Sequence, residues 1–79
     1  MYLTILSTQQ KKTIIISWIE VETAAGNFVI QKNHAPTILA ILPNQPINMC
    51  LSNGKQETFQ SPGGILEITR EKAILLLDE

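Results

Sequence analysis

Residues 47–59 read INMCLSNGKQETF, and they contain the clearest structural signal of the chain. Two short segments of apolar and polar residues, 47–51 and 56–59, flank the sequence Ser52-Asn53-Gly54-Lys55. Asn-Gly accepts a positive φ at both central positions of a two-residue turn, which is the backbone that joins two antiparallel strands most tightly. The stretch therefore predicts a β-hairpin.

On both sides of this hairpin, the chain divides into further short strands separated by turn signals. Residues 13–21 are dense in isoleucine, whose branching at Cβ restricts χ1 in helices and favours strands. The other expected strands are residues 2–6, 28–30, 37–42, 65–69 and 73–77, with turns at Gly26-Asn27, at Pro43-Asn44-Gln45-Pro46 and at Ser61-Pro62-Gly63-Gly64. Short strands at this spacing are typical of a β-sandwich or barrel.

The C-terminal stretch is ambiguous by propensity alone. Glu71, Lys72 and the leucines at 75–77 are good helix formers. Residues 65–69 alternate instead, and too few residues remain for a helix that packs well, so we expect a last hairpin around Arg70-Glu71. The adjacent glycines, Gly63 and Gly64, suggest a bulge or a close approach of two backbones.

Residues 13–21 do not fit a strand with one wet face. Period-2 alternation places Ile14, Ile16 and Trp18 on one side of the sheet, and Ile15, Ile19 and Val21 on the other. Three explanations remain open: the domain covers both sides of the strand, a partner covers one side, or a β-bulge shifts the register within the strand.

Composition excludes several classes of function. A net charge of −1 with only 6 scattered basic residues argues against nucleic acid as a partner. The N-terminus lacks the features of a signal peptide, and the longest apolar runs, 38–42 and 73–77, are far shorter than a membrane span. We therefore expect no direct membrane insertion and a soluble chain when isolated. A domain of 79 residues buries roughly 60 to 65% of its extended-chain surface, which predicts marginal stability.

The residues that usually carry catalysis or bind metals are sparse. His34 and Cys50 are the single histidine and the single cysteine, and they lie in different segments without an orienting acid, so neither a nucleophile pair nor a zinc site is expected. Cys50 is most simply a small buried hydrophobe. Glu20 and Glu22 lie at i and i+2 on one strand face, which is typical of a solvated strand end. We predict no catalytic residues, no cofactor and no metal.

Two blocks of the sequence resemble one protein family, the epsilon subunits of F-type ATP synthases. The block GNFVIQKNHAP at residues 26–36 is similar to the family's glycine-rich turn, short strand and His-Ala-Pro loop. The block SPGGILEI at residues 61–68 resembles its Ser-Gly-Gly-Ile-Leu-Glu segment, and residues 72–78 resemble its closing strand. The resemblance covers essentially the whole chain, residues 1–79, as one N-terminal domain of that family.

The resemblance implies an all-β fold, an antiparallel β-sandwich of two sheets with about ten short strands. It also implies a non-catalytic place in the central stalk, bound to the gamma subunit and in contact with the polar loops of the c-ring, where the domain helps to couple proton-driven rotation to ATP synthesis. Such a subunit is peripheral and lies on the cytoplasmic face of the energy-transducing membrane. His34, Asn27 and Ser7 match the positions that contact gamma or the c-ring in the family.

The sequence departs from the family at specific positions. Asn27 replaces the usual acid, Val29 the second glycine, and Lys32-Asn33 the Pro-Gly before the histidine; Asn33 substitutes for glycine if that position needs a positive φ. The family's C-terminal helical hairpin has no match in these residues, so we expect neither the inhibition of ATP hydrolysis nor the ATP binding that belongs to it. The alternative hypothesis is a free-standing β-sandwich adaptor that binds an unrelated protein.

Overall fold

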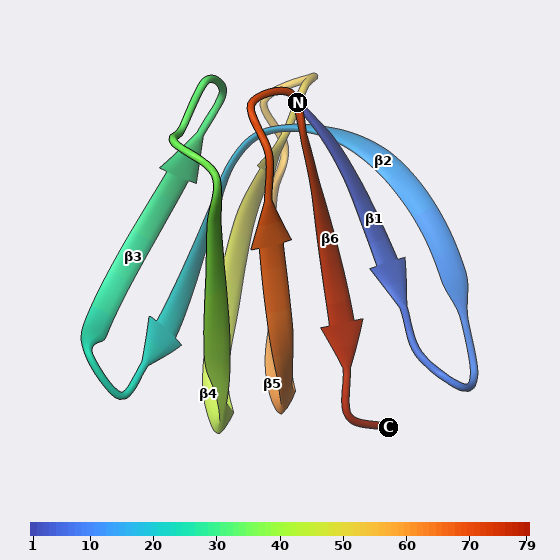
Figure 1. Cartoon of the computed structure of the whole chain (residues 1–79). Helices are drawn as coiled ribbons and strands as arrows, with labels where there is room; N and C mark the ends of the chain where they lie inside the picture. The colour runs from blue at the N-terminus through green and yellow to red at the C-terminus, as the bar shows by residue number, and fades with distance from the viewer.

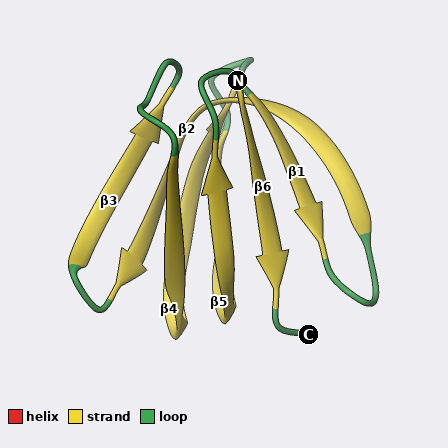
Figure 2. Ribbon diagram, viewed as in Figure 1, coloured by secondary structure: helices red, strands yellow, loops and turns green.

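A computed structural model describes the whole chain, residues 1–79, and contains strands, turns and loops but no helix (Figures 1 and 2). There are six strands: β1 (Tyr2–Leu6), β2 (Lys11–Thr23), β3 (Gly26–Gln31), β4 (Thr37–Leu51), β5 (Gln56–Ile68) and β6 (Lys72–Leu77). The all-β prediction for a single small domain is confirmed. The predicted C-terminal hairpin is also confirmed, since β5 and β6 pair antiparallel. The helix propensity of the leucines at 75–77 does not produce a helix.

Hydrogen bonds join all six strands into one sheet. The order is β1-β6-β5-β4-β2-β3, and an additional pairing between β1 and β2 closes five of the strands into a ring, with β3 added on β2. β1 and β6 lie side by side and run in the same direction, so this pair is parallel (Figure 1). The prediction of a purely antiparallel fold is therefore wrong for this one pair.

The prediction of about ten short strands in two sheets is corrected to six longer strands. Pro43-Asn44-Gln45-Pro46 and Ser61-Pro62-Gly63-Gly64 do not end strands, since the β4–β5 ladder continues through both stretches. The register shifts between Pro43 and Pro46, where β4 has one residue more than β5, and Asn44 has a φ of 61° there. A residue inserted in this way is a β-bulge, which bends the strand while pairing continues.

The puzzle of the two apolar faces of β2 is resolved by a second bulge. Ile16 pairs with Leu51 but Trp18 pairs with Cys50, so Ser17 is the extra residue in β2. Before the bulge the even-numbered Ile16 is buried, and after it the odd-numbered Ile19 is buried. The register shift explains why Ile16 and Ile19, on opposite phases of the strand, are both buried, whereas Ile15 is 49% exposed.

The core fills the space inside the closed sheet. It consists of 14 buried aliphatic side chains, contributed by every strand: Leu3, Ile5, Ile16, Ile19, Val21, Ile30, Ile41, Ile47, Met49, Leu66, Ile68, Ala73, Leu75 and Leu77. Cys50 lies outside this cluster and is only half-buried, which corrects the expectation that it is a core residue. Inward-facing side chains from all six strands thus hold the ring together.

The predicted hairpin at residues 52–55 forms, with a different turn geometry. Gly54 has a φ of 90°, while Asn53 keeps a negative φ. The Gly54 amide donates to the Leu51 carbonyl at 2.9 Å, and the Asn53 side chain accepts a bond from the Lys55 amide at 2.9 Å. The turn therefore needs glycine at only one of the two positions where a positive φ was expected.

Candidate functional site

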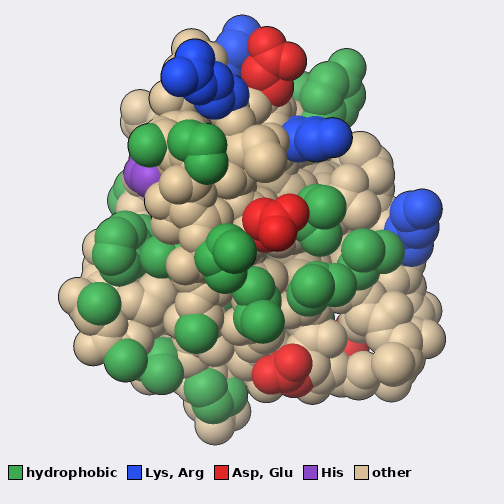
Figure 3. Space-filling model, in the orientation of Figure 1, with side chains coloured by type: hydrophobic (Ala, Val, Ile, Leu, Met, Phe, Trp, Pro, Cys, Tyr) green, Lys and Arg blue, Asp and Glu red, His purple; other side chains and the backbone are tan.

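An apolar face lies on the outer surface of β4, β5, β6 and β1. Its members are outward-facing residues that the strand register places side by side: Ile38, Ala40 and Leu42 on β4, Ile65 on β5, Ile74 and Leu76 on β6, and Leu6 on β1. Four of them are large and exposed, with 69% of Ile38, 37% of Leu42, 45% of Ile65 and 46% of Leu76 accessible to solvent. Figure 3 shows hydrophobic side chains gathered on the side of the molecule formed by β4, β5 and β6, with basic side chains toward the rim.

Cross-strand pairs make this apolar face continuous. Ala40 lies opposite Ile65, Ile65 opposite Leu76, and Leu76 beside Leu6. Directly opposed side chains on neighbouring strands are in contact distance. A contiguous exposed apolar surface on a small domain marks an interaction site. The uninterrupted apolar runs at 38–42 and 73–77 are the sequence signal for this face. A strand with one polar face alternates apolar and polar residues and has no such run.

Ser7 lies in the turn between β1 and β2, where it organises the backbone. Its Oγ accepts bonds from the amides of Gln9, at 3.0 Å, and Gln10, at 3.1 Å. The same turn holds Glu79: the Gln10 side-chain Nε2 donates to Glu79 Oε1 at 2.9 Å, and the Thr8 hydroxyl donates to the Glu79 main-chain oxygen. The Gln10 amide, and to a lesser extent the Ser7 hydroxyl, hold the pKa of the Glu79 carboxyl below its usual range, because both stabilise the charged form.

Asn27 is the second residue of β3 and is exposed. Its Nδ2 donates to Glu22 Oε1 at 2.6 Å across the β2–β3 pair. Glu20, on the same side of β2, accepts a bond at 2.8 Å from the side-chain nitrogen of Asn48 on β4. The two carboxylates that the sequence placed on one strand face are thus each paired with an asparagine amide on an outer surface and do not share a cleft.

His34 lies in the loop between β3 and β4 and is half-buried. Its Nδ1 is 2.8 Å from the Ala35 carbonyl; since a carbonyl only accepts, Nδ1 carries the proton and Nε2 remains available. Asn33, just before it, has a φ of 67°, which confirms that this position needs a residue tolerant of the left-handed region. The Asn33 amide donates to the Arg70 carbonyl at 3.0 Å and ties the loop to the β5–β6 turn.

The structure does not bring the three predicted contact residues together. The β1–β2 turn and the β2–β3 turn lie at the lower end of the domain in Figure 1, whereas the β3–β4 loop lies at the upper end. Ser7 and Asn27 thus belong to one end of the domain and His34 to the other. The apolar face extends between the ends, and the sequence did not predict it as a site.

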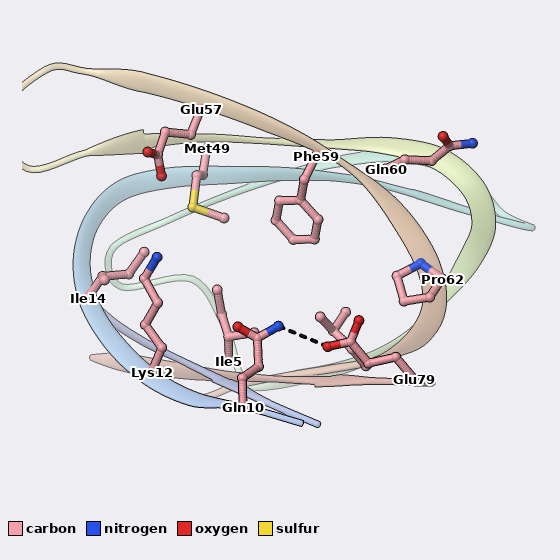
Figure 4. Close-up of a pocket in the computed structure, with 11 residues that line it drawn as sticks. Ile5, Gln10, Lys12, Ile14, Met49, Glu57, Phe59, Gln60, Pro62 and Glu79 are labelled. Atoms are coloured by element: carbon pink, nitrogen blue, oxygen red, sulfur yellow. Dashed lines mark hydrogen bonds between the residues drawn. The ribbon is translucent and has the colours of Figure 1, made fainter. Parts of the chain in front are cut away.

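A cavity of about 270 Å³ opens beside the β1–β2 turn (Figure 4). Met49 and Phe59 line one side of it, and Ile5 and Gln10 the opposite side, where Gln10 is bonded to Glu79. The cavity is the mouth of the apolar core. Its charged residues, Lys12, Glu57 and Glu79, belong to separate strands and to the C-terminal segment, and no hydrogen bond or ion pair links any two of them.

No helix in the structure meets the length and hydropathy needed to cross a membrane. No group of three or more His, Cys, Asp and Glu side chains is placed to hold a metal ion.

Known proteins are similar to this chain in sequence and in fold. Residues 3–79 match the family described as the β-sandwich domain of the ATP synthase delta/epsilon chain. The ATP synthase epsilon chain of Chlorobaculum tepidum is 43% identical over 54 residues, which are 68% of this chain and 60% of that protein. The epsilon chain of Chlorobium limicola is 41% identical over the same lengths. The matched segment thus spans less than two thirds of these curated relatives.

Two solved structures share the fold at low sequence identity. A chain of the Euglena gracilis mitochondrial ATP synthase, in a structure of OSCP, F1 and the c-ring, superposes with a TM-score of 0.84 at 16% identity, over 98% of this chain and 49% of that one. A chain of the Tetrahymena thermophila mitochondrial ATP synthase, in a structure of the central stalk and c-ring, gives a TM-score of 0.83 at 14% identity, over 99% and 63% of the two chains. Because the family match covers nearly every residue, this chain belongs to the family of the β-sandwich domain of ATP synthase delta/epsilon chains.

Proposed function

We propose that this chain is a central-stalk subunit of a rotary F-type ATP synthase that binds the gamma subunit through the apolar face and contacts the c-ring. The observation that carries the proposal is the continuous apolar face of β4, β5 and β6 on a chain of this family. Burial of such a surface is the dominant favourable term in most protein association. The matches to chains of two ATP synthases, in structures that contain the c-ring, support the same assignment.

The proposed role is mechanical and not catalytic. A rotor subunit transmits torque, so it needs a stiff body and firm contacts rather than reactive groups. The closed ring of strands and its single aliphatic core provide that stiffness. We propose that the domain couples rotation driven by proton flow to ATP synthesis by linking gamma to the c-ring, as a peripheral subunit on the cytoplasmic face of the membrane.

We also propose that the two ends of the domain serve different contacts. His34 lies at one end, while Ser7 and Asn27 lie at the other, so one flat partner surface at either end does not reach all three. A contact with gamma and a contact with the c-ring need two separated surfaces, and the separation of these residues supports that assignment. Asn27 offers an amide where the family has an acid, so its contact is a hydrogen bond and not an ion pair.

The test is direct binding of this chain to the gamma subunit of its own organism by calorimetry. We expect the double variant Ile65→Thr and Leu76→Thr to weaken binding at least about tenfold, because hot-spot truncations at the centre of an interface cost more than about 1 kcal/mol. The matched control is Val29→Thr, since Val29 is 48% exposed against 45% for Ile65 but lies on β3, away from the apolar face.

The outcomes of this test separate the hypotheses. Gamma binding that the face variant weakens and the control does not would support the rotor function. A chain that folds but fails to bind gamma, and instead recovers unrelated proteins from native extract, would be a free-standing adaptor that has borrowed the fold.

A further inference from the structure

The apolar face contains one acid, Glu67, in the row next to Ile65 and Leu76. The register places Ile38 opposite Glu67 on β4 and Ile74 opposite it on β6, and Ile65 is the next outward residue on β5 itself. Glu67 is exposed, and its carboxylate makes no hydrogen bond or ion pair within the chain. The nearest cation on the neighbouring strand, Lys72, lies at the diagonal position and does not pair with it.

A partner that covered this face with apolar atoms alone would bury the Glu67 carboxylate without a counterion. Burial of an unpaired charge is strongly unfavourable, whereas burial of a charge that is paired and hydrogen-bonded is tolerated. The occupant of the face must therefore bring a cation to one defined point.

We infer that the apolar face recognises an apolar partner surface that carries a single arginine or lysine opposite Glu67, and that Glu67 determines which partner is accepted. The inference rests on the proposed function, under which this partner is the gamma subunit. Arginine suits the position best, because its planar guanidinium binds a carboxylate with two parallel hydrogen bonds and is more weakly hydrated than an ammonium.

The same carboxylate argues against a second copy of this chain as the occupant. Two copies that pair through one face are related by a two-fold axis, so each residue near the axis meets itself. A dimer whose two-fold axis passes beside Glu67 would place the two Glu67 carboxylates close together among isoleucines, and Lys72, at the diagonal position, is not paired with Glu67 in the chain. The charge thus disfavours self-association about that axis while it selects a basic partner, which is specificity by repulsion as well as attraction.

The first experiment compares Glu67→Gln with Glu71→Gln in calorimetric binding to the gamma subunit. Glu71 is an exposed acid in the β5–β6 turn, outside the face, and is the matched control. We expect Glu67→Gln to weaken binding at least about thirtyfold, because truncation of one member of a buried charge pair leaves the other uncompensated, and Glu71→Gln to change it less than twofold. Wild-type binding to gamma with no loss in Glu67→Gln would overturn the inference and leave the proposed function standing, whereas no wild-type binding would overturn the proposed function.

A second pair of variants tests whether the counterion comes from the partner. If Lys72 swings onto Glu67 when the face is covered, the effect of Glu67→Gln will vanish in a Lys72→Met background. We expect the effect to persist at full size there, because the cation belongs to gamma. Loss of the effect would overturn the inference.

Sedimentation of the chain alone tests the role of the charge without gamma. We expect the wild type and Glu71→Leu to stay monomeric at about 100 µM, and Glu67→Leu, which makes the face wholly apolar, to dimerise. A wild-type dimer that Ile65→Thr dissolves, or a Glu67→Leu variant that remains monomeric, would overturn the role assigned to Glu67 in excluding a second copy.

Discussion

At the scale of single residues, Gly64 is the position with the least tolerance for a side chain. It lies where β5 passes the main chain of β6, and a Cβ built on it would lie 2.0 Å from the Leu76 carbonyl oxygen. The obstacle is backbone, which cannot rotate away as a side chain does. The sequence suggested a bulge or a close approach of two backbones at Gly63-Gly64. At Gly64 the structure shows the close approach.

We predict that Gly64→Ala destabilises the domain by at least about 3 kcal/mol, because the β5–β6 ladder must separate to admit the methyl group. Urea denaturation followed by circular dichroism measures the change. Gly54→Ala is the control: a methyl group added there would meet no atom within 4 Å, so only the φ of 90° opposes the substitution. A loss of about 1 to 2 kcal/mol is expected there, and equal losses in the two variants would contradict the steric account.

Asparagine meets two backbone requirements of this chain that glycine usually meets. Asn33 and Asn44 have φ values of 67° and 61°, in the left-handed region that asparagine tolerates better than most residues. For Asn33 the sequence allowed this conformation, because asparagine stands there in place of a glycine of the family. For Asn44 the sequence did not predict it, because the surrounding prolines indicated a turn between strands and not a bulge inside one.

At the scale of elements, one residue in β2 determines which side chains enter the core. Ser17 is the extra residue of the bulge, and the buried phase changes from even to odd numbers across it. A shift of one residue exchanges the two faces of a strand. Ile16 and Ile19 therefore enter the same core only because Ser17 is present between them.

We predict that deletion of Ser17 prevents folding. Without this residue, Ile19, Val21 and Thr23 would face outward, and the alternating residues of β2, such as Glu20 and Glu22, would face the core. Far-ultraviolet circular dichroism and a thermal melt measure the result. The control is Ser17→Ala, which keeps the residue count and replaces an exposed side chain; it should change stability by less than about 0.5 kcal/mol. A deletion variant that melts like the wild type would show that the bulge is dispensable.

The β1–β2 turn and the C-terminal residue form a second coupled element. Bonds from Gln10 and from the Ser7 hydroxyl lower the pKa of Glu79. A carboxyl whose pKa is lower in the folded state stabilises folding at pH values above its unfolded pKa, and this contribution disappears as the pH falls through the folded pKa. The contact between the turn and the Glu79 carboxylate is therefore stronger at neutral pH than in acid.

We predict that Gln10→Ala raises the pKa of Glu79 toward its ordinary value, because the largest stabiliser of the charged form is removed. An NMR titration of the Glu79 side chain measures this pKa. Gln9→Ala is the matched control, since the Gln9 side chain makes no bond to Glu79. An unchanged pKa in Gln10→Ala would mean that the amide bond seen in the structure does not persist in solution.

At the scale of the whole molecule, a small core and a large exposed apolar face belong together. The core has 14 side chains, and several aliphatic residues that other domains would bury remain on the surface. A domain of this size is marginally stable alone, and any ligand that binds only the folded state adds to its stability. The partner is expected to complete the hydrophobic burial that the chain leaves unfinished.

We predict that the gamma subunit raises the melting temperature of this chain by more than about 10 °C when its free concentration is about 100 times Kd, because such binding adds about 2.7 kcal/mol and each kcal/mol shifts the midpoint of a domain this small by about 4 to 8 °C. Melting is followed on a label attached to this chain. The Ile65→Thr and Leu76→Thr double variant should lose most of the shift at the same gamma concentration. A wild-type midpoint that gamma leaves unchanged would argue against the interface.

Local features of the sequence determined the strands, the hairpin at Asn53-Gly54, the left-handed Asn33 and the family, because propensity, turn chemistry and motif spacing act over a few neighbouring residues. The parallel pairing of β1 with β6, the ring closed by β1 and β2, and the continuation of β4 and β5 through their bends became visible only in the folded chain. The fold also separated His34 from Ser7 and Asn27 and surrounded Glu67 with isoleucines. These properties depend on which distant strands pair and in which register, and a single bulge residue, invisible to a period-2 pattern, changes every face that follows it.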